Sequence, residues 1–317
     1  MLVVAVASTA QARQFRSDDV QAADSPTVRA VAYTGEVLKQ RTNGRLGIDI
    51  GPNDKDAENF TVGQVQTGLL DMARVNLSVF NSALPATIVP TLPFVFRSPA
   101  HMRRVLDGPI GQQILLSMET RGLIGLCFYG SGARSFYSRT PIRKVADMKG
   151  LAVRVQPSGV TADMIRAMGG RAVAIPFDQT RAALKAGLVD VAENTWPGYV
   201  AAGHDRVAPY FNLTEHSMMP SVLVFSRKIW LELSGDEQKA IRSAAKDSVM
   251  FLRQHIDSYE VEARLKAEVN GTQVIDDVDR KSFAKALVPL YPQLAPEPGL
   301  QAMVREAQAD GEVASEP

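Results

Sequence analysis

The sequence has too little cysteine for a disulfide or for the common zinc sites. Its 317 residues include one cysteine, Cys127, and four scattered histidines. One cysteine makes no intramolecular disulfide, and no cysteine–histidine spacing suits zinc. Because Cys127 lies in the apolar run GLIGLCFYG, we expect a buried strand thiol. The sequence therefore predicts no metal and no cofactor.

The motifs of common catalytic sites are also missing. The chain has no phosphate-binding glycine loop, no dinucleotide-binding glycine motif, no serine-nucleophile elbow and no zinc-protease helix motif. The segment YGSGAR sets a serine between glycines at the wrong spacing for such an elbow. No catalytic residue is assigned, and a protein that is not an enzyme is favoured.

Excess charge of one sign and long apolar runs are absent too. Lysine and arginine number 35 against 34 aspartates and glutamates, a net charge of +1. This balance gives no field that would capture nucleic acid or an anionic membrane. No apolar run approaches the roughly 20 residues of a membrane helix. We expect no nucleic-acid partner and no direct membrane insertion, and any anion specificity must come from a few placed residues.

The first residues have the pattern of a shortened export signal. The stretch MLVVAVASTAQA has a short apolar part and ends in the Ala-x-Ala form of a secretory cleavage site. It lacks a basic leading region, so residues 1–12 are interpreted as a remnant signal peptide. An ordinary buried first strand is the alternative. We expect an exported protein whose mature part begins near Arg13.

Chain length and the order of elements predict a two-domain α/β protein. The length exceeds what a single core usually supports. Strand-like and helix-like segments alternate along the chain, which favours α/β architecture. One helix is expected between Ser25-Pro26 and Asn43-Gly44, because both ends carry typical capping residues.

Two segments repeat one short pattern. QTGLLDMARVN, residues 66–76, and KAGLVDVAENT, residues 185–195, share the frame Gly-Leu-x-Asp-x-Ala. In both, a helix is expected to end at glycine and a short polar-capped strand to follow. Chance similarity is the alternative to two lobes of like topology. With two lobes, the polar strand ends would border the ligand crevice of open α/β sheets. These polar residues are Arg74, Asn76, Glu193 and Asn194.

The C-terminal third predicts one long helix. From Asp236 to Asn270 the chain has neither glycine nor proline, and apolar residues recur at helical spacing. A helix of about 33 residues is about 50 Å long, which exceeds the diameter of a lobe of ~120 residues. We therefore expect a helix over about 236–269 that spans both lobes. A coiled coil is the alternative, but sustained heptads are absent.

Several polar and aromatic side chains stand at expected strand or loop ends. In GLAVRVQPSG, alternation places Arg154 on the face away from the apolar residues. Arg134 and Arg154 suit a carboxylate, since a guanidinium offers it two parallel hydrogen bonds. Asn194 both donates and accepts, as a hydroxyl requires. Phe177 or Trp196 would supply an apolar wall for a ring.

Each of these residues also has a purely structural alternative. Arg154 is otherwise an exposed strand arginine or half of an interdomain salt bridge, and Arg134 a surface arginine. Asn194 would satisfy loop backbone. Phe177 would be core and Trp196 a hinge-packing residue.

Six segments together resemble the solute receptors of tripartite ATP-independent periplasmic (TRAP) transporters, over about Arg13 to Pro292. They are TVRAVAYTGEVLKQRTNGRLGIDI, VPTLPFVFRSPAHMRRVLDGPIG, YGSGARSFYS, PIRKVADMKGLAVRVQ, IPFDQTRAALKAGLVDVAEN and LTEHSMMPSVLVFSRKIW. The resemblance implies a two-lobed periplasmic binding protein fold with crossing segments and a long bridging C-terminal helix. Lobe I is expected over 13–131 and 222–259, and lobe II over 132–221 and 260–317.

The resemblance also implies a set of ligand-binding residues. It makes Arg154 the central carboxylate binder, Arg134 a second contact, Phe177 the ring-packing aromatic and Asn194 a polar clamp. The loop after Ile50 departs from the family pattern, and Glu58 is the nearest candidate for a contact from it. Positions that vary with ligand in the family correspond to Asp18, Arg74, Asn76 and His216.

The implied activity is reversible binding without chemistry. The segments SGARSFY and LTEHSM look most like receptors for hexuronates such as D-glucuronate or D-galacturonate. We therefore expect a monomeric periplasmic receptor that holds the sugar acid between its lobes and delivers it to a TRAP membrane permease. A C4-dicarboxylate or another organic acid is the alternative ligand, and a sugar-acid-modifying enzyme is the alternative from another class.

Overall fold

The computed structural model describes residues 12–21, 23–51, 58–155 and 159–309. The chain divides into two compact units. Unit 1 contains the described residues of Met1–Val75, Leu115–Tyr129 and Val222–Leu252, and unit 2 those of Asn76–Ile114, Gly130–Ser221 and Arg253–Pro317. The lobe boundaries expected from the sequence differ mainly at 76–114 and stay a prediction. Residues 1–11 of the interpreted export signal lie outside the described residues.

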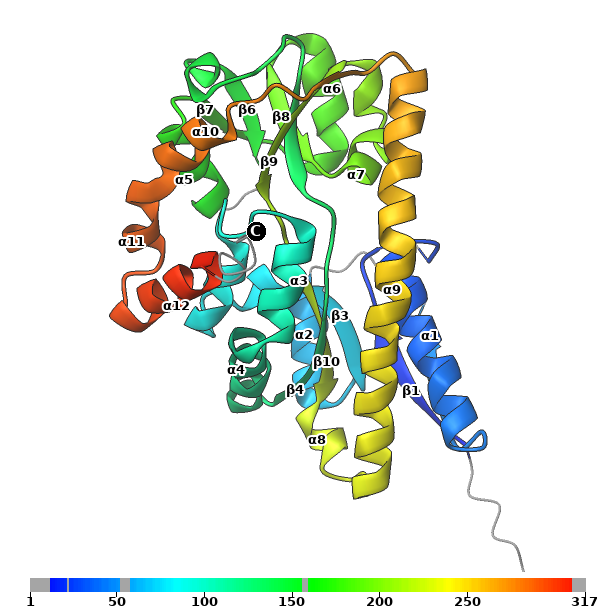
Figure 1. Ribbon diagram of the computed structural model, residues 1–317. Coiled ribbons are helices and arrows are strands. Elements are labelled where there is room, and N and C mark those ends of the chain that lie inside the picture. Colours follow the sequence, from blue (N-terminus) through cyan, green and yellow to red (C-terminus); the bar gives the residue numbers. More distant parts are fainter. Residues whose placement is uncertain (1–11, 22, 52–57, 156–158, 310–317) are drawn as a thin grey trace, which may run out of the picture. The chain divides into compact units, whose positions relative to one another are not determined.

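Unit 1 combines a β-sheet with α-helices, as the sequence predicts. Its described strands form a sheet in the order β2-β1-β3-β10-β4. The strands are β1 (Arg13–Asp18), β2 (Leu46–Ile50), β3 (Met72–Asn76), β4 (Leu123–Tyr129) and β10 (Ser221–Ser226). Strand β1 runs parallel to both β2 and β3. The helices α1 (Pro26–Arg41), α2 (Glu58–Thr67) and α8 (Arg227–Trp230) belong to this unit, and α1 packs against β2 (Figure 1).

Helix α1 confirms the capping residues identified in the sequence. The Ser25 hydroxyl accepts a hydrogen bond from the backbone N–H of Val28 at 3.4 Å, and Pro26 occupies the first turn. Asn43 and Gly44 follow the helix with φ values of 52° and 81°. This left-handed backbone stops a helix and favours glycine and asparagine.

Unit 2 contains the second sheet, in the order β11-β9-β5-β8-β6-β7. Its strands are β5 (Arg134–Ser138), β6 (Ala152–Val155), β7 (Arg171–Ala174), β8 (Val191–Asn194), β9 (Tyr210–Ser217) and β11 (Gln273–Ile275). Strand β6 is parallel to β7 and β8, whereas β5 is antiparallel to β8 and β9. The sheet is therefore mixed, and β5 and β9 are strands that the sequence did not predict.

Helices α5 (Gly159–Ala167), α6 (Thr180–Ala186) and α7 (Trp196–Ala201) follow strands β6, β7 and β8 of this second sheet along the chain. Further α-helices are α3 (Pro99–Asp107), α4 (Pro109–Ser117), α10 (Arg280–Leu287), α11 (Tyr291–Leu294) and α12 (Pro298–Ala309). Short 3-10 helices are η1 (Leu77–Phe80), η2 (Pro85–Thr91), η3 (Met118–Arg121), η4 (Val145–Met148), η5 (Phe177–Gln179), η6 (His204–Arg206) and η7 (Val288–Leu290).

The long C-terminal helix is confirmed. Helix α9 runs without a break over Gly235–Val269, and its residues pass from unit 1 to unit 2 after Leu252 (Figure 1). Among the described residues, no helix has both the length and the apolar character needed to cross a membrane. Cys127 is buried on β4, as expected.

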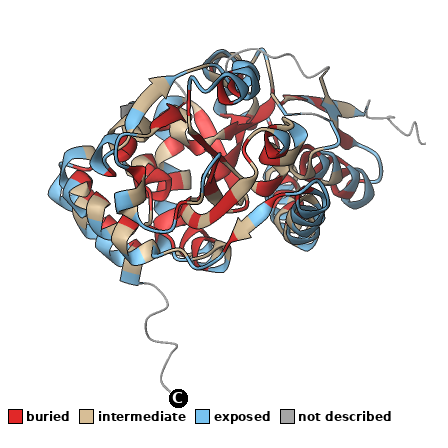
Figure 2. Ribbon diagram, turned by 90° about the horizontal axis from the view of Figure 1, so that it is seen from above, coloured by how far each residue is buried: buried red, intermediate tan, exposed pale blue. Residues whose placement is uncertain are grey.

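Strand β6, which carries Arg154, is covered by protein on both faces. All four residues of β6 are buried, and Figure 2 shows the strands largely in the colour of buried residues. Val153 and Val155 lie in one apolar core, whereas Ala152 lies in the core on the opposite face. Arg154 leaves the Val153 face as predicted, but it enters protein rather than solvent and is 2% exposed. Gln156 lies outside the described residues.

The repeated sequence frame corresponds to the same local structure in both units. Gly68 and Gly187 follow helices α2 and α6 with φ values of 78° and 72°, a conformation that costs glycine little. Three residues after each glycine, an aspartate (Asp71 or Asp190) immediately precedes the next strand.

The two aspartates of the frame make equivalent hydrogen bonds. The Asp71 carboxylate accepts from the backbone N–H of Arg16, and that of Asp190 from the N–H of Ala152, both at 2.8 Å. Each donor immediately precedes the residue of its strand that pairs with the parallel strand after the aspartate: Ser17 pairs with Met72, and Val153 with Val191. The aspartates thus join parallel strands at the same point of the two units.

We predict that Asp71→Ala and Asp190→Ala each lower the free energy of unfolding by about 1–3 kcal/mol, because each leaves a strand N–H without its acceptor. The corresponding asparagine variants keep an oxygen acceptor and should cost less. Urea denaturation measures both, with the exposed Asp276→Ala as control. An equal loss in the control variant would show that the strand contacts do not carry the effect.

Candidate functional site

Arg154 is a buried cation that forms no ion pair with a described carboxylate. Its Nε donates to the carbonyl oxygen of Ile175 at 2.9 Å. No carboxylate of the described residues lies within 4.0 Å of its nitrogens. Burial lowers the pKa of Arg154, and the more distant Glu193 and Tyr137 oppose that shift. The environment therefore favours arrival of an anion.

Aromatic side chains and a neutral histidine surround this guanidinium. The Phe177 ring lies 5.6 Å from the Arg154 guanidinium carbon and is 42% exposed, so it is not the core residue of the structural alternative. His204 packs edge-on against Phe177, and its Nδ1 bonds the Tyr137 hydroxyl at 2.7 Å. Burial, with Arg154 nearby, lowers the pKa of His204 to about 4. His204 is thus neutral near pH 7.

Arg134, by contrast, is already paired. Its Nε and Nη2 donate to the two oxygens of the Glu193 carboxylate at 2.5 and 3.0 Å, and Nη2 also donates to the Glu193 carbonyl at 3.2 Å. Burial alone would raise the pKa of Glu193, but Arg134 and His216 hold it well below the ordinary range. The pair is a fork of charge-assisted hydrogen bonds in a largely buried setting.

His216 belongs to the surroundings of this pair. Its ring stacks on Phe136 with centroids 4.1 Å apart, and its Nδ1 bonds the Thr214 hydroxyl at 2.9 Å. Its Nε2 lies 3.8 Å from a Glu193 oxygen. Burial lowers the pKa of His216, while Glu193 opposes the shift. His216 is therefore a buried, neutral neighbour of Arg134 and Glu193.

Two other predicted residues of unit 2 have structural contacts. The Asn194 amide oxygen accepts from the backbone N–H of Thr195 at 2.9 Å, the loop-backbone role named as its alternative. Trp196 stacks on Phe211 with centroids 3.6 Å apart and is 8% exposed. Trp196 is therefore mainly a core residue of this unit.

In unit 1, Arg74 pairs with Asp19, an aspartate that the sequence analysis did not identify, and Glu58 and Asp18 lie beside this pair. Arg74 is 3% exposed, and its guanidinium forms a two-bond fork with the Asp19 carboxylate, with Nε at 2.7 Å from Oδ2. Glu58, at the start of α2, places Oε1 3.9 Å from the Arg74 Nη1. The Asp18 carboxylate accepts from the Asp19 backbone N–H at 2.8 Å. Asn76 ends β3, and residues 52–57 of the altered loop lie outside the described residues.

The structure thus brings the predicted residues together in separate groups. In unit 2, Arg154 lies beside Phe177, and Arg134 lies with His216 around Glu193. A signal for Glu193 was present in the sequence, since the repeated frame aligns it with Arg74. Arg74 and Glu193 are both charged, and each forms an ion pair within its own unit, Arg74 with Asp19 and Glu193 with Arg134.

The chain belongs to a family of bacterial receptors. Its residues 18–297 match the family described as "Bacterial extracellular solute-binding protein, family 7", so most of the chain is covered. A solute-binding protein of Chromohalobacter salexigens is 32% identical over 311 residues, which cover 97% of this chain and 93% of the relative.

Solved structures give the same result. A TRAP periplasmic solute-binding protein from Xanthobacter autotrophicus Py2, with bound β-D-galacturonate, is 44% identical with a TM-score of 0.84, covering 93% of this chain and 99% of that one. A second, from Chromohalobacter salexigens with bound D-glucuronate, is 31% identical with a TM-score of 0.86 and covers 93% and 99% of the chains.

These matches confirm several expectations from the sequence. The fold is that of TRAP solute receptors, and the family consists of extracytoplasmic binding proteins rather than enzymes. The roles of the individual site residues, and the division into lobes, stay predictions.

We predict that Glu193→Gln lowers the free energy of unfolding by about 3–5 kcal/mol at pH 7, because it leaves the buried Arg134 without a counter-charge. The double variant Arg134→Met, Glu193→Leu should cost much less, since it removes both charges. Urea denaturation of the two variants measures the difference. Equal losses would contradict the pairing.

Acid provides a second measurement of the same pair. Because the folded-state pKa of Glu193 is depressed, its stabilising contribution is present above the ordinary carboxyl pKa and is lost as the pH falls below it. The wild type should therefore lose more stability than the double variant does on going from pH 5 to about pH 3.

Proposed function

We propose that this receptor binds a hexuronate, D-galacturonate or D-glucuronate, outside the cytoplasm and delivers it to the membrane permease of a TRAP transporter. The family supports the receptor class. The ligands of the two solved relatives, which are galacturonate and glucuronate, support the ligand class. A monomeric state remains part of the proposal.

The observation that carries this proposal is the unpaired guanidinium of Arg154. A buried charge costs several kcal/mol unless it has a partner. The ligand carboxylate would supply that partner through two parallel hydrogen bonds. Arg154 has no described carboxylate within 4.0 Å, so a ligand carboxylate would be the first direct counter-charge among these groups. The exposed Phe177 ring beside it offers an apolar wall to the less polar face of a sugar.

The charge balance favours one carboxylate over two. A C4-dicarboxylate needs a second cation without a partner. Arg134 is already paired with Glu193, and Arg74 with Asp19. Of the three predicted arginines, Arg154 alone lacks a described carboxylate partner, which supports a sugar monoacid rather than the dicarboxylate alternative.

The remaining predicted residues are proposed to serve the uncharged part of the sugar. Their amides, carboxylates and imidazole suit hydroxyl groups, which both donate and accept, and the guanidinium and indole N–H groups can donate to hydroxyl oxygens. The proposed contacts are Arg134, Asn194, Asn76, Asp18, Arg74, His216, Trp196 and Glu58.

We predict that D-galacturonate and D-glucuronate raise the melting temperature, whereas succinate and the uncharged sugar galactose do not. A ligand present at 100 times its Kd stabilises by about 2.7 kcal/mol, so a thermal-shift screen ranks the candidates directly. Aldonates test whether the closed ring is needed. Stronger stabilisation by succinate than by either uronate would overturn the ligand assignment.

We predict that Arg154→Ala weakens hexuronate binding by about 2–5 kcal/mol, the range for truncating one partner of a buried charge pair. Arg154→Lys keeps the charge but loses the two-bond geometry, so it should recover only part of the affinity. Titration calorimetry measures both. Arg166→Ala, on the exposed side of α5, is the control and should bind as the wild type. Unchanged affinity in Arg154→Ala would exclude this arginine as the carboxylate binder.

A further inference from the structure

A cavity of about 210 Å³ lies within unit 2, beside the segments that carry the ligand-site residues. Glu260 of helix α9 lines it, together with Gly132 in the segment before β5 and Trp196 at the start of α7. These three residues come from parts of the chain that are distant in sequence. None of the site roles described above involves Glu260.

The Glu260 carboxylate packs directly on the backbone of Gly132. A Cβ atom at Gly132 would stand 2.1 Å from the Glu260 Oε1 and 2.3 Å from its Cδ. Only glycine therefore allows this approach without moving the carboxylate. Gly132 stands two residues before Arg134, so its position bears on where β5 and its arginine begin.

The segment that follows β8 lines the same cavity as Glu260, through Trp196. The backbone N–H of Trp196 favours the ionised form of Glu260 and so opposes the rise of its pKa. Trp196 follows Glu193 and Asn194, the last residues of β8, by two or three positions. Glu260 therefore packs on the segment leading into Arg134 and shares a cavity with the segment leaving its partner Glu193.

We propose that Glu260 is a positioning residue of the ligand site, whose ionised carboxylate ties the Gly132 segment to the start of α7 and so fixes Arg134 and Asn194 in relation to each other. This inference rests on the proposed function, because it takes these two residues as part of the hexuronate site. Glu260 itself need not touch the ligand.

The charge of Glu260 is sensitive to pH near neutrality. Burial, with a smaller contribution from Asp257, raises the pKa of Glu260 to about 7, and the Trp196 N–H opposes this. The other charged groups at the cavity are themselves paired: Arg103 of α3 with Asp257, and Glu215 of β9 with Arg280. Arg264 of α9 lies over the Trp196 ring and pairs with Glu268. The Trp196 contact therefore weakens as Glu260 is protonated below about pH 7.

Stability and binding should respond to this proton in opposite directions. Because the folded-state pKa of Glu260 lies above the unfolded value, the folded form retains the proton longer, and stability falls as the pH rises toward 7. Ligand binding needs the ionised carboxylate and should improve over the same pH range. A residue with a purely structural role would change both in the same direction.

The main experiment compares Glu260→Gln with the wild type, because glutamine keeps the shape and cannot ionise. Calorimetry with D-galacturonate and D-glucuronate between pH 5.5 and about 8.5 should show affinity rising through pH 7 in the wild type only. At high pH the variant should bind about tenfold more weakly, as expected for a lost hydrogen bond to a charged group. At this high pH, the melting temperature of Glu260→Gln should be no lower than that of the wild type. Glu262→Gln, an exposed change on the same helix, is the control and should match the wild type.

Gly132→Ala provides a second variant that leaves the charge in place. The added methyl group displaces the end of the flexible Glu260 side chain, and Gly132 does not have a positive φ, so the fold is retained. This variant should lose affinity as Glu260→Gln does. Wild-type affinity in either variant overturns the proposal.

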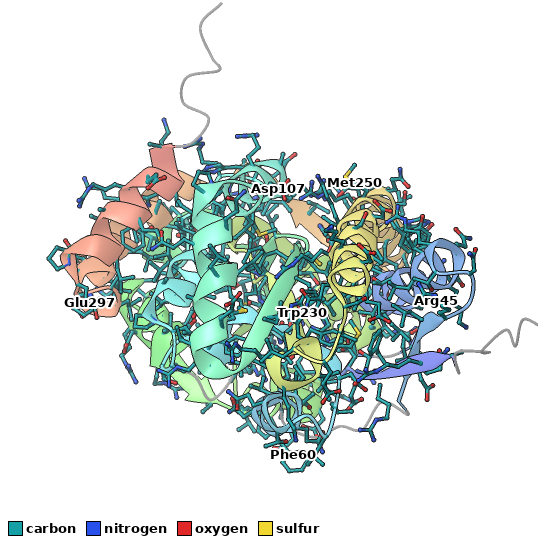
Figure 3. The ribbon with its side chains drawn as sticks, turned by 90° about the horizontal axis from the view of Figure 1, so that it is seen from below. Arg45, Phe60, Asp107, Trp230, Met250 and Glu297 are labelled. Carbon is teal, nitrogen blue, oxygen red and sulfur yellow. The ribbon has the colours of Figure 1, made fainter. Side chains whose placement is uncertain are left out.

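Tryptophan fluorescence tests the contact without a ligand. Trp230, labelled in Figure 3, belongs to unit 1 and is the other tryptophan, so Trp230→Phe isolates the emission of Trp196. In that background the emission should titrate near pH 7, and adding Glu260→Gln should abolish the titration. If the emission does not titrate, the contact between Glu260 and Trp196 is overturned. If the titration is present but no hexuronate binds the wild type, the proposed function fails and the Glu260 contact stands.

Discussion

The constraint on which the proposed site depends is the buried guanidinium of Arg154, which has no carboxylate partner among the described residues. Every other buried charge of the described ligand-site residues is balanced within the protein, as Arg134 is by Glu193 and Arg74 by Asp19. Arg154 is stabilised by one carbonyl hydrogen bond and by the Phe177 ring. The buried guanidinium therefore carries an electrostatic cost, which an incoming monoanion would relieve under the proposed function. Selectivity for an anion would then arise from one position rather than from the net charge of +1.

Much of the fold follows from local sequence signals. The ends of α1 and the whole of α9 were predicted because capping residues and helical periodicity are properties of neighbouring residues. Strands β5 and β9 were not predicted, since their pairing is antiparallel and joins residues more than 70 positions apart. Alternation correctly separated Arg154 from Val153, but it could not show that protein covers both faces of β6.

The partners of the site residues were harder to predict than the residues themselves. The family resemblance pointed to Arg134 and Arg74, and the repeated frame pointed to Glu193. Asp19, and the pairing of Glu193 with Arg134, emerge only from the arrangement of neighbouring strands. Charge pairing of this kind depends on which strands are neighbours, and sequence spacing carries no such information. The assignment of Asn194 illustrates the same limit, because its amide oxygen is engaged by the next residue of its own loop.

The repeated frame fixes where side chains emerge but not their charge. Counting from the equivalent donors Arg16 and Ala152, Asp18 of unit 1 corresponds to Arg154 of unit 2. The equivalent backbone position therefore carries an acidic side chain in the first unit and a basic side chain in the second. Repetition of structure has therefore not produced repetition of charge: at this matched position, the first unit would repel the carboxylate that the second is proposed to attract.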